Sequence, residues 1–293
     1  MSVRNFVPEI WVANVDTALR KKLIYAGDAI VNRDYEGDIA EQGDTVHVTT
    51  VGRPTVYDYV PGVTTVTAES ITLGQRTFQV DQAKYWSIGL DDVDKRQAAQ
   101  DFMPVATDEA GFAVADGIDQ YVASLYTQIP TGQSVGSVTA DLTPATGAGA
   151  WEAEAKKVYD DLLVPLSVQL DNQDVPDEGR YVTIPPWLYG LLRRDPRFIE
   201  ADKSANPAAL RTGEVGDAAG FKIMKSRNVP QSVAGSYVIT AGTAKAITYA
   251  SQITQMEALR SQTAFADQIR SLYVFGAKLF RPDHIAMGIA VKT

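Results

Sequence analysis

The chain has 293 residues, of which 45% are hydrophobic and 22% charged, and its formal net charge is −9. This length and apolar share are enough to bury a core in one large domain or two ordinary ones. The sequence contains no cysteine and two histidines, His47 and His284, neither in a zinc-motif spacing. Disulfides, thiolate chemistry and cysteine metal sites are therefore excluded. An acidic chain without a concentrated basic run is not typical of proteins that bind nucleic acid tightly.

No membrane association is predicted. The sequence has no run of the roughly 20 apolar residues that a membrane-spanning helix needs. The N-terminal MSVRNFVPEIW lacks the apolar core and the cleavage site of a signal peptide.

The first predicted element is an amphipathic helix over residues 12–30, where apolar residues recur at steps of three and four. The acidic turn that follows, NRDYEGD at 32–38, superficially resembles a calcium-binding loop. A loop of that type starting at Asn32 would need glutamate where the chain has Gly43. We interpret the segment as a solvated turn.

Residues 45–90 are rich in threonine and valine, with alternating apolar positions interrupted by glycine and proline. This pattern predicts β structure, but the middle, VYDYVPGVTTVTAES at 56–70, is too polar and interrupted to form a core. A two-stranded excursion is marginally stable alone. We expect it to be an arm that lies on another part of an assembly.

A second helix is predicted over residues 104–129, between Pro104 and Pro130. The glycine- and threonine-rich segment 131–150 is interpreted as a linker at a domain boundary. A third helix is predicted from Trp151, with Pro165 expected to end or kink it. Further along, we expect a strand at 180–184, a short helix near 187–192 and a run of strands from 237 to 291.

The segment GEVGDAAGFKIMKSRNVP, residues 213–230, could suggest a phosphate-binding loop. The intervals between Gly213, Gly216 and Gly220 fit neither the P-loop nor the dinucleotide fingerprint. The alternation from Phe221 predicts a strand. We therefore expect a glycine turn before a strand, with positive φ at Gly216, Gly220 or both.

No catalytic constellation is complete in the sequence. Ser236 has no histidine nearby in the chain and no nucleophile-elbow motif. Paired carboxylates could serve a hydrolase, but adjacent acids at element ends are more typical of solvated faces or caps. These pairs are Asp91 with Asp92, Asp160 with Asp161, and Asp171 with Asp174. We predict no catalytic, cofactor-binding or metal-binding residue, no cofactor and no enzyme activity.

Four aromatic residues, Tyr57, Tyr59, Tyr85 and Trp86, could in principle stack on nucleic-acid bases. They are not interleaved with lysine or arginine in the pattern of such surfaces. We interpret them as strand-pairing or subunit-interface residues.

Three segments in order resemble the major capsid proteins of tailed bacteriophages, which share the Hong Kong 97 capsid fold. They are LDNQDVPDEGRYVTIPP at 170–186, GFKIMKSRNVP at 220–230 and EALRSQTAFADQIRSLYVFGAKLFRPDHIA at 257–286. They match the family's "VP…GRYVV…P", "G…GF.I..S.N.P" and "vR…YGAK..RP" segments. The coat-protein branch typical of short-tailed phages is the most similar.

The resemblance implies an α+β fold with an N-terminal arm, an extended β-hairpin loop, a peripheral domain with a long spine helix, and an axial domain. The expected divisions are 1–44 for the N-terminal arm and first helix, 45–92 for the extended loop, 93–134 for the peripheral domain, 135–250 for the axial domain and 251–293 for strands returning to the peripheral domain.

The implied function is that of a major capsid protein whose pentamers and hexamers close an icosahedral shell around double-stranded DNA, without sequence-specific binding. The resemblance further implies a separate scaffolding protein, a portal, assembly in the host cytoplasm and residence in the virion. A decoration protein is left open. Some relatives crosslink a lysine of the extended loop to a neighbouring asparagine, but no lysine occurs between Lys22 and Lys84. We therefore expect a non-covalent shell.

Two alternatives remain at this point. An encapsulin-type cellular compartment would share the fold but enclose an enzyme cargo. A carboxylate-based hydrolase would belong to a different class of protein.

Overall fold

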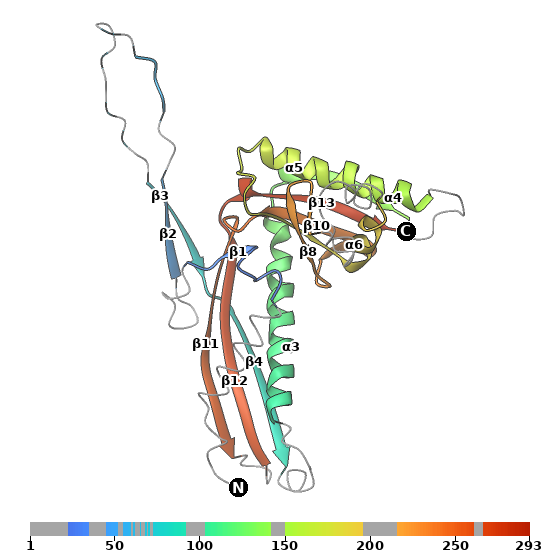
Figure 1. Cartoon of the computed structure of the whole chain (residues 1–293). Helices are drawn as coiled ribbons and strands as arrows, with labels where there is room; N and C mark the ends of the chain where they lie inside the picture. Colours follow the sequence, from blue (N-terminus) through green and yellow to red (C-terminus); the bar gives the residue numbers. More distant parts are fainter. Residues whose placement is uncertain are drawn as a thin grey trace.

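The computed structural model describes residues 23–34, 45–51, 55–59, 61, 65, 68, 70, 73–91, 103–141, 150–195, 216–260 and 266–293. The fold is α+β, as predicted. Figure 1 shows a compact sheet domain, long elements that descend from it side by side, and a hairpin that projects away from both.

A seven-stranded sheet forms the compact part of the molecule. Its strand order is β5-β13-β10-β6-β8-β7, with β9 paired to β10. All five residues of β6 are buried, which is the pattern of a central strand covered on both faces. The strands are β5 (Ser134–Ala140), β6 (Arg180–Ile184), β7 (Asp217–Ala218), β8 (Phe221–Lys225), β9 (Gln231–Val233), β10 (Ser236–Thr243) and β13 (Ile285–Lys292).

The helices α4 (Ala150–Val158), α5 (Val164–Asp171) and α6 (Pro186–Leu192) cover one face of this sheet. Leu162 approaches Gly288 of β13, and the Trp187 ring packs edge-on against Tyr237 of β10. Gly288 is paired with Ile239, which shares a face with Tyr237 because side chains alternate along a strand.

Pro165 does not end the third helix, contrary to one of the predicted outcomes. A π-helical turn, Tyr159–Leu163, joins α4 directly to α5. Proline has no N–H to donate to the preceding turn, and the wider π turn changes the hydrogen-bond register just before it. The continuous helix buries Leu162, Leu163 and Leu166 completely or nearly so.

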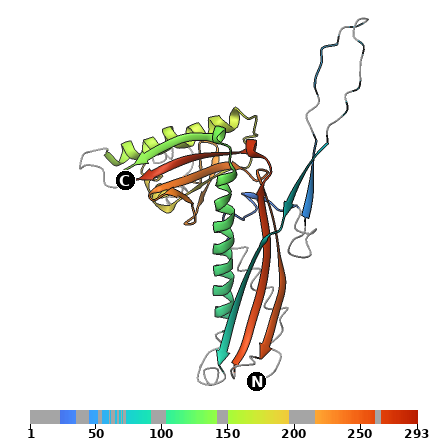
Figure 2. The ribbon, with the colours of Figure 1, turned by 180° about the vertical axis from the view of Figure 1, so that it is seen from behind.

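A four-stranded sheet and one long helix form the extended part of the molecule. The sheet order is β1-β11-β12-β4, and α3 runs along it, followed by the short 3₁₀ helix Leu125–Gln128 (Figures 1 and 2). This confirms the helix predicted over 104–129. The elements are β1 (Val31–Asn32), β4 (Gln82–Asp91), β11 (Ile247–Arg260), β12 (Ala266–Leu279) and α3 (Met103–Ser124).

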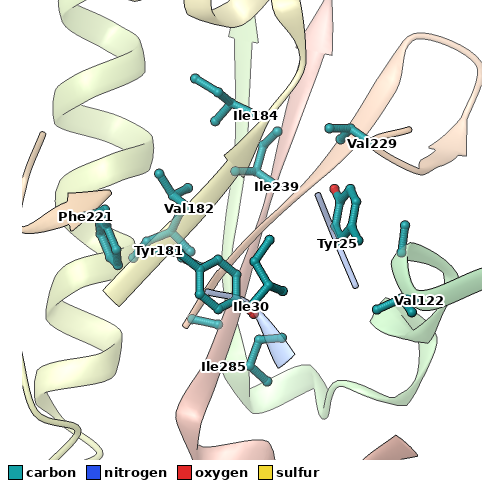
Figure 3. Packing of buried hydrophobic residues seen from close by; sticks show 14 of the residues in the cluster. Tyr25, Ile30, Val122, Tyr181, Val182, Ile184, Phe221, Val229, Ile239 and Ile285 are labelled. Carbon is teal, nitrogen blue, oxygen red and sulfur yellow. The ribbon is translucent and has the colours of Figure 1, made fainter. Parts of the chain in front are cut away.

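One hydrophobic core joins both parts. Figure 3 shows Tyr181 and Val182 of β6 in the same cluster as Phe221 of β8, Val122 of α3 and Ile30 of the N-terminal segment. The strand beginning at Phe221 and the positive φ at Gly220, 79°, confirm two further predictions.

The predicted first helix is wrong over residues 23–30. Residues 12–22 and 35–38 lie outside the described residues, but 23–30 form consecutive turns rather than a helix. The Asp119 carboxylate of α3 accepts hydrogen bonds from the backbone N–H groups of Ile24 and Ala26. These two backbone donors are thus satisfied by a side chain of α3 rather than by a helical hydrogen bond. The apolar residues that suggested a helix instead bury Ile30 and its neighbours against the core.

The predicted linker and two predicted divisions differ from the observed sheets. Strand β5 occupies 134–140 of the expected linker, with Val138 and Ala140 buried on one face. Strand β13 does not return with β11 and β12 but lies between β5 and β10. Strand β4, expected in the extended loop, pairs with β12 over ten residues. Period-two burial explains β4, where exposed and half-buried side chains alternate, and β5, which buries Val138 and Ala140. Strand β13 is held in the seven-stranded sheet by backbone pairing with β10 and β5.

The hairpin consists of β2 (Thr45–Val51) and β3 (Leu73–Gln79), paired antiparallel from Thr45 opposite Gln79 to Val51 opposite Leu73. We call residues 45–79 the arm. Figures 1 and 2 both show it leaving the molecule on the side opposite the compact sheet.

Candidate assembly interface

The loop of the arm exposes apolar and aromatic side chains. Val56 is 93% exposed, Tyr57 73% and Tyr59 65%. Every loop residue whose burial the structure describes is exposed. Large apolar side chains presented together in this way mark an interaction surface. The interface role predicted for Tyr57 and Tyr59 is consistent with this placement.

The root of the arm has a small core of its own. Phe78 and Val80 are buried with Ala250, Val274 and Phe280, in a cluster separate from the main core. The root is therefore packed within the subunit, whereas the described residues of the loop are exposed.

Tyr85 and Trp86 lie on opposite faces of β4. Tyr85 is 80% exposed, whereas Trp86 is half-buried against the main core. Of the four aromatic residues singled out in the sequence, Trp86 is thus the one that serves the subunit's own packing.

Lys84 is engaged by the subunit itself. Its ammonium group donates to the carbonyl oxygen of Gly117 in α3 at 2.9 Å and lies 6.0 Å from the centre of the Phe275 ring. A Cβ atom at position 117 would lie 2.4 Å from the Lys84 Nζ, so glycine makes room for this contact. The first lysine after Lys22 is therefore held at the sheet–helix junction.

Two carboxylates of α3 tie distant segments to the helix. Asp119 is 2% exposed, and its oxygens lie 2.9 Å and 3.1 Å from the backbone nitrogens of Ile24 and Ala26. Asp116, one turn earlier, accepts a 2.7 Å hydrogen bond from the Asn228 side chain. Burial raises the pKa of Asp119, because it disfavours the charged form more than the backbone donors favour it.

Sequence reasoning missed these two residues. The available signal was an acidic side chain, Asp119, directly beside Ile118 on the apolar stripe of the helix. A buried carboxylate needs hydrogen-bond partners. The partners here are the backbone N–H groups of residues 24 and 26, which a sequence pattern cannot reveal.

The acidic pairs considered as catalytic candidates do not converge on a site. Asp160 and Asp161 are exposed on the π turn. Asp171 pairs with the buried guanidinium of Arg180 at 2.7 Å, and Asp174 sits in a turn with φ of 56°. Position 92 and the side chain of position 91 lie outside the described residues.

The ion pairs of the buried Arg180 guanidinium give a structural reason for the GRY sequence at 179–181, which belongs to one of the family segments. The guanidinium is 2% exposed, pairs also with Asp177 at 3.0 Å and donates to the carbonyl of Pro176 at 3.0 Å. It holds the turn between α5 and β6 closed, which is a structural role.

His284 forms no metal or catalytic centre with other described residues. His284 lies within hydrogen-bond distance of the Thr243 hydroxyl, 3.1 Å. Its pKa is lowered, first by burial and then by the nearby charges of Arg281 and Lys245. The side chain at position 47 is not among those described, and Ser236 begins strand β10. No three histidine, aspartate or glutamate side chains cluster as metal ligands among the described residues.

No helix in the described ranges is long and apolar enough to cross a membrane.

Comparisons with known proteins agree with this architecture. A family model for phage capsid proteins matches residues 74–288. A chain of Mycobacterium phage Che8 is 29% identical, with a TM-score of 0.66 and 88% of each chain covered. A chain from the capsid of cyanophage P-SCSP1u is 20% identical, with a TM-score of 0.65 and coverage of 87% of this chain and 85% of that one.

A virus-like particle from Pyrococcus furiosus shares the fold at 12% identity, with a TM-score of 0.54 and coverage of 97% of this chain and 99% of that one. No curated protein sequence matches. Because the family match spans most of the chain, the chain belongs to the phage capsid protein family and is a major capsid protein with the Hong Kong 97-like fold.

Proposed function

We propose that copies of this chain associate as pentamers and hexamers and close the icosahedral head of a tailed bacteriophage around double-stranded DNA. The observation that carries this proposal is the arm, because an anchored root presents a loop with exposed Val56, Tyr57 and Tyr59. Aromatic side chains of this kind contribute strongly to protein interfaces when they are buried there.

The two sheets support the assignment of two domains within the subunit. We assign the seven-stranded sheet to the axial domain and the four-stranded sheet with α3 to the peripheral domain. The arm is the extended loop that lies across a neighbouring subunit. This division places β4 in the peripheral domain and β13 in the axial domain, in keeping with their strand partners.

The charge balance fits a container for DNA. A wall that must enclose and later release a densely packed polyanion should not bind it tightly, and the net charge of −9 agrees with weak, non-specific contact. A separate scaffolding protein and a portal complete the proposed head, which assembles in the host cytoplasm and becomes part of the virion.

We assign no catalytic activity and no cofactor to the chain. The acidic pairs that a hydrolase would use are exposed or engaged in an ion pair in the described residues. The encapsulin-type alternative has weaker support, because the likeness to the Pyrococcus furiosus particle, at 12% identity, concerns the fold alone.

Deleting residues 54–74 and closing the gap with a short glycine-serine linker tests the arm. We expect a soluble subunit with an unchanged far-ultraviolet circular dichroism spectrum that forms no shells in electron micrographs. Normal particles from the deletion variant would contradict the proposed role of the arm.

A further inference from the structure

The chain crosses itself closely where the arm leaves the sheet. Strand β4 pairs with β12 only as far as Gln82 opposite Phe275, and the preceding residues then pass over β12. A Cβ atom at Gly276 would lie 3.0 Å from the carbonyl oxygen of Gln79 and 3.0 Å from the Cα of Val80. Both neighbours are backbone atoms, so a side chain at position 276 would displace the arm itself.

Apolar contacts hold the crossing from the side. The rings of Phe78 and Phe280 meet edge to face, with centroids 5.9 Å apart and planes at 86°. Phe78 is 2% exposed and Val80 is fully buried. This packing immobilises the arm at its root, because close-packed aromatic pairs leave little room for sliding.

Polar contacts hold the same crossing through backbone atoms. The Lys278 ammonium donates to the carbonyl of Thr77 at 2.8 Å. The Arg76 guanidinium donates to the carbonyl of Phe280. Arg76 belongs to the arm and Lys278 to β12, so each of the two crossing segments donates a hydrogen bond to the backbone of the other.

We propose that the segment Phe275–Phe280 is a socket that sets the direction in which the arm leaves the subunit, with Gly276 as its positioning residue. This inference rests on the proposed contact between the arm and a neighbouring subunit. It gives a physical reason for the FGAK sequence at 275–278. The glycine lets the backbone of the arm pass close to β12, and the lysine holds the arm by a hydrogen bond to Thr77.

A small displacement at the socket becomes a large one at the end of the arm. The seven residues of β3 alone extend about 23 Å at roughly 3.3 Å per residue. A tilt at the root therefore moves the exposed loop by more than the root itself moves. The socket thereby controls where the loop meets the next subunit and how sharply the shell curves.

The test measures the arm direction in unassembled subunits. Because the chain has no cysteine, cysteines introduced at the exposed positions Asp58 and Tyr85 can carry two unique spin labels. In this labelled background we compare Gly276→Ala and Gly276→Val with Gly89→Ala. Gly89 is the matched control, because it lies in the same sheet and a Cβ there meets nothing within 4 Å.

We expect the label-to-label distance to shift for Gly276→Ala, to shift further for Gly276→Val and to stay unchanged for Gly89→Ala. The yield of closed shells from the corresponding unlabelled variants should fall in the same order. If Gly276→Val fails to fold, Lys278→Met, which keeps the apolar stem but loses the bond to Thr77, should broaden the distance distribution. Unchanged distances in both Gly276→Ala and Lys278→Met would overturn the inference. Normal assembly of the 54–74 deletion would instead overturn the role of the arm and leave the distance result intact.

Discussion

The seven-stranded sheet and the arm differ in where their apolar side chains find partners. In the sheet, all five residues of β6 are buried within the same subunit, and Phe221 is fully buried. In the arm, residues 55–59 are all exposed, including two tyrosines. The subunit thus buries its apolar side chains in the sheet and leaves the described residues of the loop exposed, as the proposed contact with a neighbouring subunit requires. The arm root, with its small separate core, lies between these extremes.

Phe221→Ala tests the sheet side of this comparison and should have the largest effect on stability. Removing a fully buried phenylalanine should lower the free energy of unfolding by about 3–5 kcal/mol. Chemical denaturation of unassembled subunits measures the change. A loss below about 1 kcal/mol would mean that the sheet is not the stabilising core.

Asp119→Ala tests the link between α3 and the N-terminal segment. The substitution leaves the buried N–H groups of Ile24 and Ala26 without their acceptor, which should cost about 2–4 kcal/mol in total. Asp119→Asn retains one acceptor oxygen and should cost less. Equal losses for both variants would show that the hydrogen bonds to residues 24 and 26 are not the cause.

The same residue predicts a pH dependence. Burial raises the pKa of Asp119 above its ordinary value of 3.8, so the folded chain binds more protons than the unfolded chain between the two pKa values. The contribution of Asp119 to the free energy of unfolding therefore decreases as pH rises through that range. The difference in stability between wild type and Asp119→Asn, measured from pH 3 upward, should show this decrease; a difference that grows with pH would contradict it.

Gly220→Ala should have a smaller effect that comes from backbone conformation alone. An added Cβ would meet nothing within 4 Å at either glycine, but Gly220 has a φ of 79° whereas Gly216 has no left-handed φ. We expect Gly220→Ala to cost about 1 kcal/mol and Gly216→Ala to cost close to nothing. Equal decreases in melting temperature for the two variants would show that the positive φ of Gly220 is not the cause of the destabilisation.

The double variant Tyr57→Ala with Tyr59→Ala tests the arm side of the comparison. Because both rings are exposed in the subunit, its free energy of unfolding should change by less than about 0.5 kcal/mol. Shell yield in electron micrographs should nevertheless fall several-fold. Unaltered assembly would show that these rings are not interface residues.

The contacts of the arm should also be non-covalent. The two described lysines at the root of the arm are engaged within their own subunit, Lys278 with the carbonyl of Thr77 and Lys84 with that of Gly117, and the chain has no cysteine. Mature particles boiled in detergent should therefore run as one band near 31.8 kDa. A ladder of covalent multimers would mean that another amine has been overlooked.

The sequence predicted the long helix, the strand at 180–184 and the glycine turn well, because each has a local signal in spacing or composition. It misplaced the strand at 134–140, because serine, threonine and glycine suggest a linker when the partner strand, β13, lies far along the chain. It also gave no sign of the socket at Gly276 or of the backbone partners of Asp119. Both depend on close approach between segments remote in sequence, which local patterns do not encode.

An electron cryomicroscopy reconstruction of the shells formed by this chain would show where the arm lies after assembly. We expect a closed shell in which residues 55–59 lie against a neighbouring subunit, while the arm root keeps its contact with Gly276 of its own chain. Particles in which the arm folds back onto its own subunit, or a purified chain that forms no shell under any assembly condition, would contradict this expectation.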